Sequence, residues 1–141
     1  MIHYHGTPIT PRSVAVEMLR RRHGLVSYAH PEQIGIVAEV CQSFCLDNGA
    51  FTHWKAGGSV NVELYAEWVR RWWRHPGFDW CLIPDVIDGD EAANDAMFAR
   101  WFSAGMPFDH RCVPVWHMHE SIARLQRLCR DFPRVALGSS G

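Results

Sequence analysis

The sequence predicts an α/β protein with about five parallel strands and covering helices. Short, continuously apolar runs alternate with segments of helical periodicity along the chain. Runs that are apolar at consecutive positions are typical of strands buried on both faces of a parallel sheet. No internal repeat, low-complexity segment or linker divides the chain, so we expect a single domain over residues 1–141.

In the first third of the chain, a helix is expected to begin at Thr10-Pro11, because proline is tolerated in the first helical turn. A short β-type run follows over residues 25–29. The apolar stretch over residues 34–40 is compatible with a loop or a short helix, because its periodicity supports neither clearly. Residues 43–47 then form a compact apolar run that predicts a buried strand.

In the middle of the chain, Asn61 is expected to cap a helix that ends before Pro76. A buried strand is expected over residues 79–86, and Asp90 is expected to cap the next helix. The inward face of that helix is predicted to carry Met97, Phe98, Trp101 and Phe102.

The last third of the chain repeats the alternation. Residues 112–116 predict a strand, a helix begins near Glu120, and residues 134–137 predict the final strand. The inward face of the last helix is predicted to carry Ile122, Leu125, Leu128 and Cys129.

Composition excludes several classes of protein. The chain has 141 residues, of which 48% are hydrophobic and 21% charged, and its net charge is −1. These values argue against a disordered tail, a fibre or a histone-like binder of polyanions. No apolar run approaches the roughly 20 residues of a membrane span, and the N-terminus lacks the apolar region of a secretory signal. The five cysteines are an odd number and favour a reduced, cytoplasmic protein with no membrane partner.

Two clusters of basic residues are candidates for contact with nucleic acid. The first comprises Arg20, Arg21 and Arg22, and the second comprises Arg70, Arg71 and Arg74 beside Trp72 and Trp73. Arginine can neutralise phosphate and indole can stack on an exposed base. The simpler interpretation is an amphipathic helix with solvated arginines.

Polar residues gather where the predicted strands end. These positions are Asp47-Asn48-Gly49, Asp85, His117 and Gly138-Ser139. Ligands of parallel α/β proteins bind at the carboxyl ends of the strands, so these residues are the candidates for a site. A single acid at such a position is often only a turn former or helix cap.

A metal site is an alternative for the histidines. The pattern His-x-His occurs at His3-Tyr4-His5 and at His117-Met118-His119. Residues i and i+2 of a strand point the same way, so each pair could give two imidazoles to one metal ion, as in barrel amidohydrolases. Cys41 and Cys45 have a spacing that could also serve a metal on a helix, although structural burial is the simpler explanation.

The strand-end segments together resemble the tRNA-guanine transglycosylase superfamily, and more closely its phage and bacterial relatives that install 7-deazaguanine bases in DNA. Residues 46–51 (LDNGAF) are similar to the family's DSGGF/Y motif, and residues 79–86 to the strand that ends in a base-recognising aspartate. Residues 113–117 are similar to the strand that supplies a polar base contact, and residues 136–139 to the AIGGL turn.

The resemblance implies a (β/α)8 TIM-type barrel. A complete barrel needs about 250 residues, so residues 1–141 would be a single incomplete barrel domain. The family's aspartate nucleophile and its Cys/His zinc cluster lie downstream of the glycine turn. Catalysis is therefore expected to need a missing C-terminal part, and no metal or cofactor is expected within this chain, although a full-length relative could hold zinc.

The resemblance also implies roles for individual residues. It makes Asp47 catalytic, as a general base or a holder of the incoming base. The implied base-binding residues are Asp47, Asn48, Phe51, Asp85, His117, Gly138 and Ser139. Physically, a carboxylate can accept hydrogen bonds from the N–H edge of a purine, and a phenyl ring can stack on its face. The sequence departs from the family at Asn48 and Ala50, and Trp116 or His117 replaces the usual glutamine.

We therefore expect a transglycosylase-like protein that binds guanine or 7-deazaguanine for base exchange in nucleic acid. Its enzyme class would be that of a pentosyltransferase, and its partners would be DNA or tRNA and a purine-like base. One alternative is a metal-dependent barrel hydrolase that uses His3, His5, His117 and Asp85. Another is a non-catalytic, truncated interaction module whose sheet is completed by another chain or a second copy.

Overall fold

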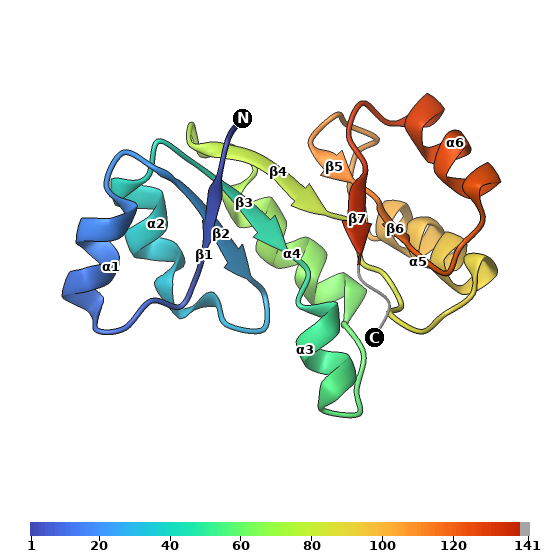
Figure 1. The fold of residues 1–141 in the computed structure, drawn as a ribbon, viewed down its shortest axis with the longest axis horizontal. Helices are drawn as coiled ribbons and strands as arrows, with labels where there is room; N and C mark the ends of the chain where they lie inside the picture. The colour runs from blue at the N-terminus through green and yellow to red at the C-terminus, as the bar shows by residue number, and fades with distance from the viewer. Residues whose placement is uncertain (139–141) are drawn as a thin grey trace.

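The computed structural model describes residues 1–138 and has an α/β fold (Figure 1). A five-stranded parallel sheet has the order β1-β2-β3-β4-β5, and a two-stranded parallel sheet joins β6 to β7. The strands are β1 Tyr4–Gly6, β2 His23–Ser27, β3 Ser43–Asp47, β4 Phe78–Leu82, β5 Cys112–Val113, β6 Val115–His117 and β7 Ala136–Gly138.

Helices occupy most of the connections between strands. They are α1 Arg12–Leu19, the short 3₁₀ helix η1 Pro31–Gln33, α2 Ile34–Val40, α3 Ala50–Lys55, α4 Val62–Trp72, α5 Glu91–Ser103 and α6 Ile122–Asp131. Side-chain caps begin the last three, since Asn61, Asp90 and Ser121 each accept a hydrogen bond from a first-turn backbone N–H.

Only Pro114 separates the two sheets. Proline has no backbone N–H to give to a strand ladder, so the regular pairing stops there. On one side of Pro114, the carbonyl of Val113 accepts a hydrogen bond from Ile83, which follows β4. On the other side, the carbonyl of Pro114 itself accepts one from Ala136 of β7. Within each sheet, strand order follows chain order without a reversal.

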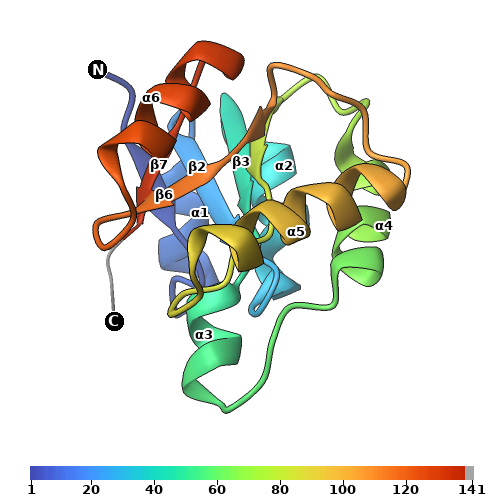
Figure 2. The same cartoon turned by 90° about the vertical axis from the view of Figure 1, so that its right-hand side faces the viewer.

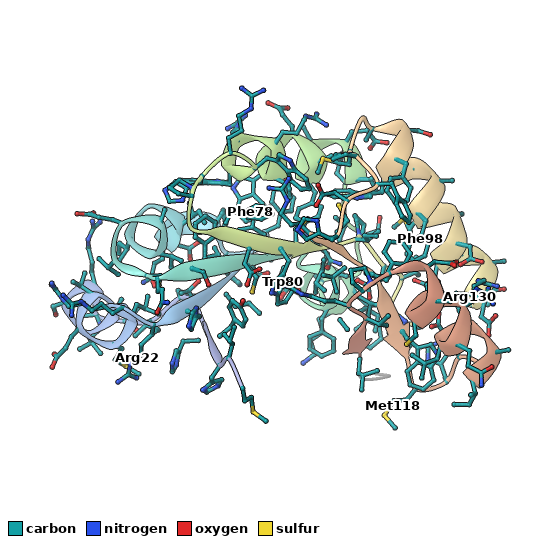
Figure 3. All side chains as sticks on the ribbon, turned by 90° about the horizontal axis from the view of Figure 1, so that it is seen from above. Arg22, Phe78, Trp80, Phe98, Met118 and Arg130 are labelled. Carbon is teal, nitrogen blue, oxygen red and sulfur yellow. The ribbon has the colours of Figure 1, made fainter. Side chains whose placement is uncertain are left out.

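The sheet has one helix-covered face and one open face (Figure 3). Phe78 points to the helix-covered side and packs against Phe44 and Trp73. A register shift between β3 and β4 follows Phe78, so Trp80, two residues later, lies on the opposite side, where its ring meets that of Tyr4. Seen from above, the strands follow a curve, and α4 and α5 lie along its outer side.

The core lies between this sheet and its helices. Tyr65 of α4 and Trp101 of α5 are fully buried, with ring centroids 5.4 Å apart. The Tyr65 hydroxyl donates toward the carbonyls of Leu46 and Leu82, at 3.3 and 3.0 Å, where β3 and β4 end. The helix layer thereby fixes the ends of two strands on which candidate residues follow.

The structure confirms the predicted α/β class and finds a strand that overlaps each of the five predicted runs, while the run at 112–116 is split at Pro114. It adds β1 and α3, which were not predicted, and it makes residues 34–40 a helix. The predicted inward face of the last helix is wrong in part, because Ile122 is 61% exposed and Cys129 is exposed. Arg124 takes the inward position instead, since its guanidinium pairs with buried and half-buried acids.

Two further features bear on the sequence predictions. All five cysteines are free thiols. Among residues 1–138, no helix is long and apolar enough to span a membrane.

Candidate functional site

A cavity of about 150 Å³ lies on the open face at the carboxyl ends of the strands. Its lining contains six of the seven predicted base-binding residues, namely Asp47, Asn48, Phe51, Asp85, His117 and Gly138. The seventh, Ser139, lies outside the described residues. Leu82, Ile87 and Val115 add apolar walls. Residues nominated one strand end at a time are thus brought together in space.

Asn48 connects the ends of β3 and β4. Its side-chain amide donates to Asp85 Oδ1 at 2.6 Å and to the carbonyl of Ile83 at 2.9 Å. Its side-chain oxygen accepts from the backbone N–H of Ala50 at 2.8 Å. Asn48 is almost completely buried, and three bonds use most of its hydrogen-bonding capacity. Its role is to hold Asp85 against the end of β3.

Asp85 is also bonded to His117. The Nε2 atom of His117 lies 2.8 Å from Asp85 Oδ2, and both side chains are buried. The hydrogen bond to Asp85 is the main reason that the pKa of His117 is raised, against the opposing effect of burial. Each carboxylate oxygen of Asp85 therefore has one protein donor and keeps a further lone pair for a ligand.

Asp47 lies at the end of β3 on the same cavity. Burial raises the pKa of its carboxyl group, and the nearby charge of Asp85 adds to this effect. Hydrogen bonds from the Ser27 hydroxyl and the backbone N–H of Gly49 oppose it. A carboxyl group with a raised pKa can exchange protons closer to neutral pH, which suits a general acid or base.

Two glycines allow close packing around the cavity. Gly49 has a φ of +74°, and a Cβ there would lie 2.8 Å from the backbone nitrogen of Ala29. A Cβ on Gly138 would lie 2.8 Å from Val115 Cγ1 and 2.9 Å from His117 Cδ2. Only glycine at position 138 lets β7 approach the His117 ring without displacing it.

Phe51 stands at the rim on α3, which projects beyond the carboxyl end of β3 (Figures 1 and 2). Its side chain is 43% exposed, and its ring centroid is 5.8 Å from that of Trp54. The ammonium group of Lys55 lies 4.5 Å from the ring centroid. The ring is thus available as a flat apolar surface beside the carboxylates.

Three buried polar residues behind the cavity were not predicted as site residues. Glu120 accepts hydrogen bonds from the His117 backbone N–H at 3.0 Å and from Asn94 at 3.1 Å. Arg124 donates to Glu120 at 3.3 Å and to Asp95 at 3.0 Å. The only sequence signal of this buried group was the position of Arg124, which lies beside Leu125 among the apolar positions of the last helix.

The histidines of the alternative metal site lie apart. His3 and His5 have ring centroids 4.6 Å apart near the start of β1. Burial lowers the pKa of His5, and the nearby Arg22 and His23 add to this effect. His117 is at the end of β6, bonded to Asp85, and stacks on His119 at 5.5 Å. Within the described residues, no three His, Cys, Asp or Glu side chains are grouped to hold a metal ion.

The aromatic residues of the second basic cluster are engaged with the protein. Trp72 packs edge-on against Phe44, and the guanidinium of Arg111 lies 3.9 Å from the Trp73 ring centroid. Arg70 donates to the carbonyl of Ala104 at 2.6 Å. These contacts favour the interpretation as an amphipathic helix over one in which these indoles stack on bases.

A larger cavity of about 530 Å³ opens at the other end of the same face, near Tyr4 and Trp80. Its one carboxylate, Asp79, already accepts from Tyr4 and from Arg134. Its size exceeds that of the carboxyl-end cavity, but its chemistry is less suited to a polar ligand because its charges are paired.

Comparisons of the chain with protein-family models, with curated proteins and with solved structures found no match.

Proposed function

We propose that this chain binds a guanine or 7-deazaguanine base in the cavity at the carboxyl ends of its strands. The observation that carries the proposal is the convergence of Asp47, Asn48, Phe51, Asp85, His117 and Gly138 on one cavity. The reaction class that the resemblance to transglycosylases implies is base exchange in DNA or tRNA. The recognition step is the part for which this chain supplies residues.

The cavity has the size and chemistry for a single heterocyclic base. Its volume of about 150 Å³ is well below the roughly 300–1,000 Å³ of pockets for drug-sized ligands. Asp85 offers two acceptor oxygens, which match the adjacent N–H groups of a guanine edge. Phe51 and the apolar walls at Leu82 and Val115 suit the faces of a flat ring.

Asp47 is the proposed proton-transfer group. It shares the cavity with Asp85, and burial raises its pKa. Base exchange at a glycosidic carbon also needs a nucleophile to form the glycosyl intermediate, by analogy with retaining glycosidases. We assign that role to none of the described residues.

The fold that we propose is part of a (β/α)8 barrel. In such a barrel, neighbouring strands follow one another along the chain, whereas a doubly wound sheet reverses its order at a switch point. Strand order here runs from β1 to β5 without reversal and continues through Pro114 to β6 and β7. The curved sheet with helices along its outer side also favours a barrel segment (Figure 3).

Calorimetric titration with 7-deazaguanine tests the proposed function. We expect saturable binding to the wild-type protein and weaker binding of hypoxanthine, which lacks the exocyclic amino group. Asp85→Asn should weaken 7-deazaguanine binding by about 10- to 100-fold, since hydrogen bonds to a charged acceptor contribute roughly 1.5–3 kcal/mol.

The matched control is Asp131→Asn, which makes the same chemical change at an exposed position at the end of α6. Its affinity for 7-deazaguanine should equal that of the wild type. Absence of binding to the wild type, or equal affinities for Asp85→Asn and wild type, would refute the assignment of the cavity.

A further inference from the structure

A chain of charged side chains leads from the cavity into the protein. Asp85 is bonded to His117 Nε2, and the Nδ1 atom of the same ring faces Glu120 Oε1 at 3.8 Å. Glu120 is paired with Arg124 at 3.3 Å, and Arg124 reaches Asp95 of α5 at 3.0 Å. Negative and positive groups alternate along this path.

The inner members of the chain are shielded from water. The side chains of His117, Glu120 and Arg124 have no exposed area, whereas Asp95 is 45% exposed. Buried charges are stable only when each is paired and hydrogen-bonded. Glu120 meets this condition with three donors, from Asn94, Arg124 and the His117 backbone.

His117 is placed between two carboxylates. A neutral imidazole carries a proton on only one ring nitrogen and a lone pair on the other. In this position, that lone pair would point at Asp85 or at Glu120. The Nδ1 atom has no hydrogen-bond partner, because the 3.8 Å to Glu120 Oε1 is too long for a hydrogen bond. The interaction on that side is therefore electrostatic. The surroundings therefore favour the doubly protonated ring.

We propose that His117, Glu120 and Arg124 are positioning residues that hold Asp85 as a hydrogen-bond acceptor for the ligand of the cavity. His117 does not itself hydrogen-bond to the ligand, because both of its ring nitrogens face carboxylates. This inference rests on the proposed function for its consequence in binding. The arrangement of the four side chains can be tested without a ligand.

Several titratable groups surround His117 and influence its protonation. Asp85 faces it from the segment after β4 and Glu120 from the turn before α6, and Glu120 is in turn paired with Arg124 of α6. His119 stacks on its ring, and Asp47 at the end of β3 lines the same cavity as Asp85 and His117. The two contacting carboxylates both raise the pKa of His117.

The first experiment is an NMR titration of the histidine ring protons in the ligand-free wild-type protein. We expect His117 to titrate above the ordinary histidine range, with both ring nitrogens still protonated at a pH where an ordinary histidine is neutral. His119→Gln assigns the neighbouring resonance. A His117 resonance that titrates in the ordinary range, or a neutral ring at that pH, overturns the inference whether or not 7-deazaguanine binds.

The second experiment uses Glu120→Gln, which keeps the shape of the side chain and removes its charge. It should lower the pKa of His117, because the charge of Glu120 helps to raise it. At about pH 7.5 it should weaken 7-deazaguanine binding by about tenfold, the scale of one hydrogen bond to a charged acceptor. At about pH 5.5 His117 is charged in both proteins, so the affinities should agree within about twofold.

A purely structural role for Glu120 would instead weaken binding equally at both pH values, and that result overturns the inference. Glu120→Asp, which restores the charge, should recover part of the pKa shift and of the affinity. Glu32→Gln, at an exposed position, is the matched control and should change neither. Loss of 7-deazaguanine binding in the wild type would count against the proposed function, while the NMR result would still decide the arrangement around His117.

Discussion

Asp47 combines two opposing requirements in one side chain. Its carboxylate lies on the cavity, where a ligand could use it, but burial opposes its ionisation and raises its pKa. A carboxyl group whose pKa is raised on folding favours the folded state when protonated and loses that contribution as the pH rises through its folded pKa. The residue proposed for proton transfer is therefore also a source of instability at neutral pH.

Asp47→Asn should expose this effect. Asparagine keeps an acceptor oxygen for the Gly49 N–H but has no charge to bury. The difference in melting temperature, variant minus wild type, should increase from about pH 3 to about pH 7, as measured by circular dichroism. Asp88→Asn, at an exposed position, should show no such trend. A difference that stays constant with pH would contradict the burial argument.

At this scale, a topological rule selected residues that the structure places on one cavity. Asp47, Asp85 and His117 were nominated because each follows a predicted strand, and the rule that ligands bind at strand ends does not require the strand order to be known. Glu120 and Arg124 obey no such rule. A charged residue on an amphipathic helix is expected to face solvent, and the burial of Arg124 depends on its pairing with Glu120 and with the distant Asp95.

Helix α6 offers a direct comparison between a buried and an exposed ion pair. Arg124 and Arg127 lie on the same helix and both pair with Asp95, at 3.0 and 2.8 Å. Arg124 is fully buried and also supports Glu120, whereas Arg127 is 43% exposed. The same partner is thus approached from the interior and from the surface.

Arg124→Met should destabilise the protein by about 3–5 kcal/mol, because it leaves Glu120 buried without its cation. Arg127→Met should cost about 1 kcal/mol or less, as is usual for exposed pairs. Urea unfolding at neutral pH measures both values. Equal costs for the two substitutions would show that burial of Arg124 does not govern the docking of α6.

Secondary structure was predictable where a capping residue preceded a long apolar pattern. Asn61 and Asp90 cap helices as expected, and Met97 and Trp101 of α5 are buried. Strand β1 has only three residues, among them His5, and so has no apolar run to detect. Helix α3 begins at Ala50, directly after the turn signal, without a side-chain cap. Its position depends on the left-handed backbone of Gly49, which the sequence does not specify.

Charge is distributed unevenly between the two ends of the whole molecule. Arg20, Arg21 and Arg22 precede β2, so they lie at the amino ends of the strands and are exposed. Asp85 and Asp88 follow β4 and lie at the carboxyl ends. Helix dipoles favour this arrangement, since helix C-termini meet the amino ends of parallel strands. We therefore expect phosphate groups to be attracted to the end opposite the cavity.

We expect a single-stranded DNA oligonucleotide to bind at low salt through the arginine end. The triple variant Arg20→Gln, Arg21→Gln, Arg22→Gln should weaken this binding and reduce its log–log salt slope by about two, at roughly 0.7 per phosphate contact. Fluorescence anisotropy at several salt concentrations measures the slope. Affinity for 7-deazaguanine should be unchanged in the variant. Competition between the oligonucleotide and 7-deazaguanine would place the phosphate contacts at the carboxyl end instead.

The order of the strands in the sheet could not be predicted from the amino-acid pattern alone. Alternation of strands and helices specifies a parallel sheet but fits both a barrel segment and a doubly wound sheet. The decisive contacts are specific and distant, such as the hydrogen bond from Ala136 to the carbonyl of Pro114. The observed orders are β1 to β5 in one sheet and β6-β7 in the other, and the barrel stays a proposal.

The cavity draws its walls from β3, β4, β6 and β7, which span most of the chain. An occupant can bind only when all four strand ends are in place, so its binding energy is coupled to folding of the whole sheet. Above the dissociation constant, each tenfold increase in ligand concentration should add about 1.4 kcal/mol to the free energy of unfolding. A thermal-shift screen of unlabelled nucleobases and nucleosides can therefore identify the occupant without any assay of activity.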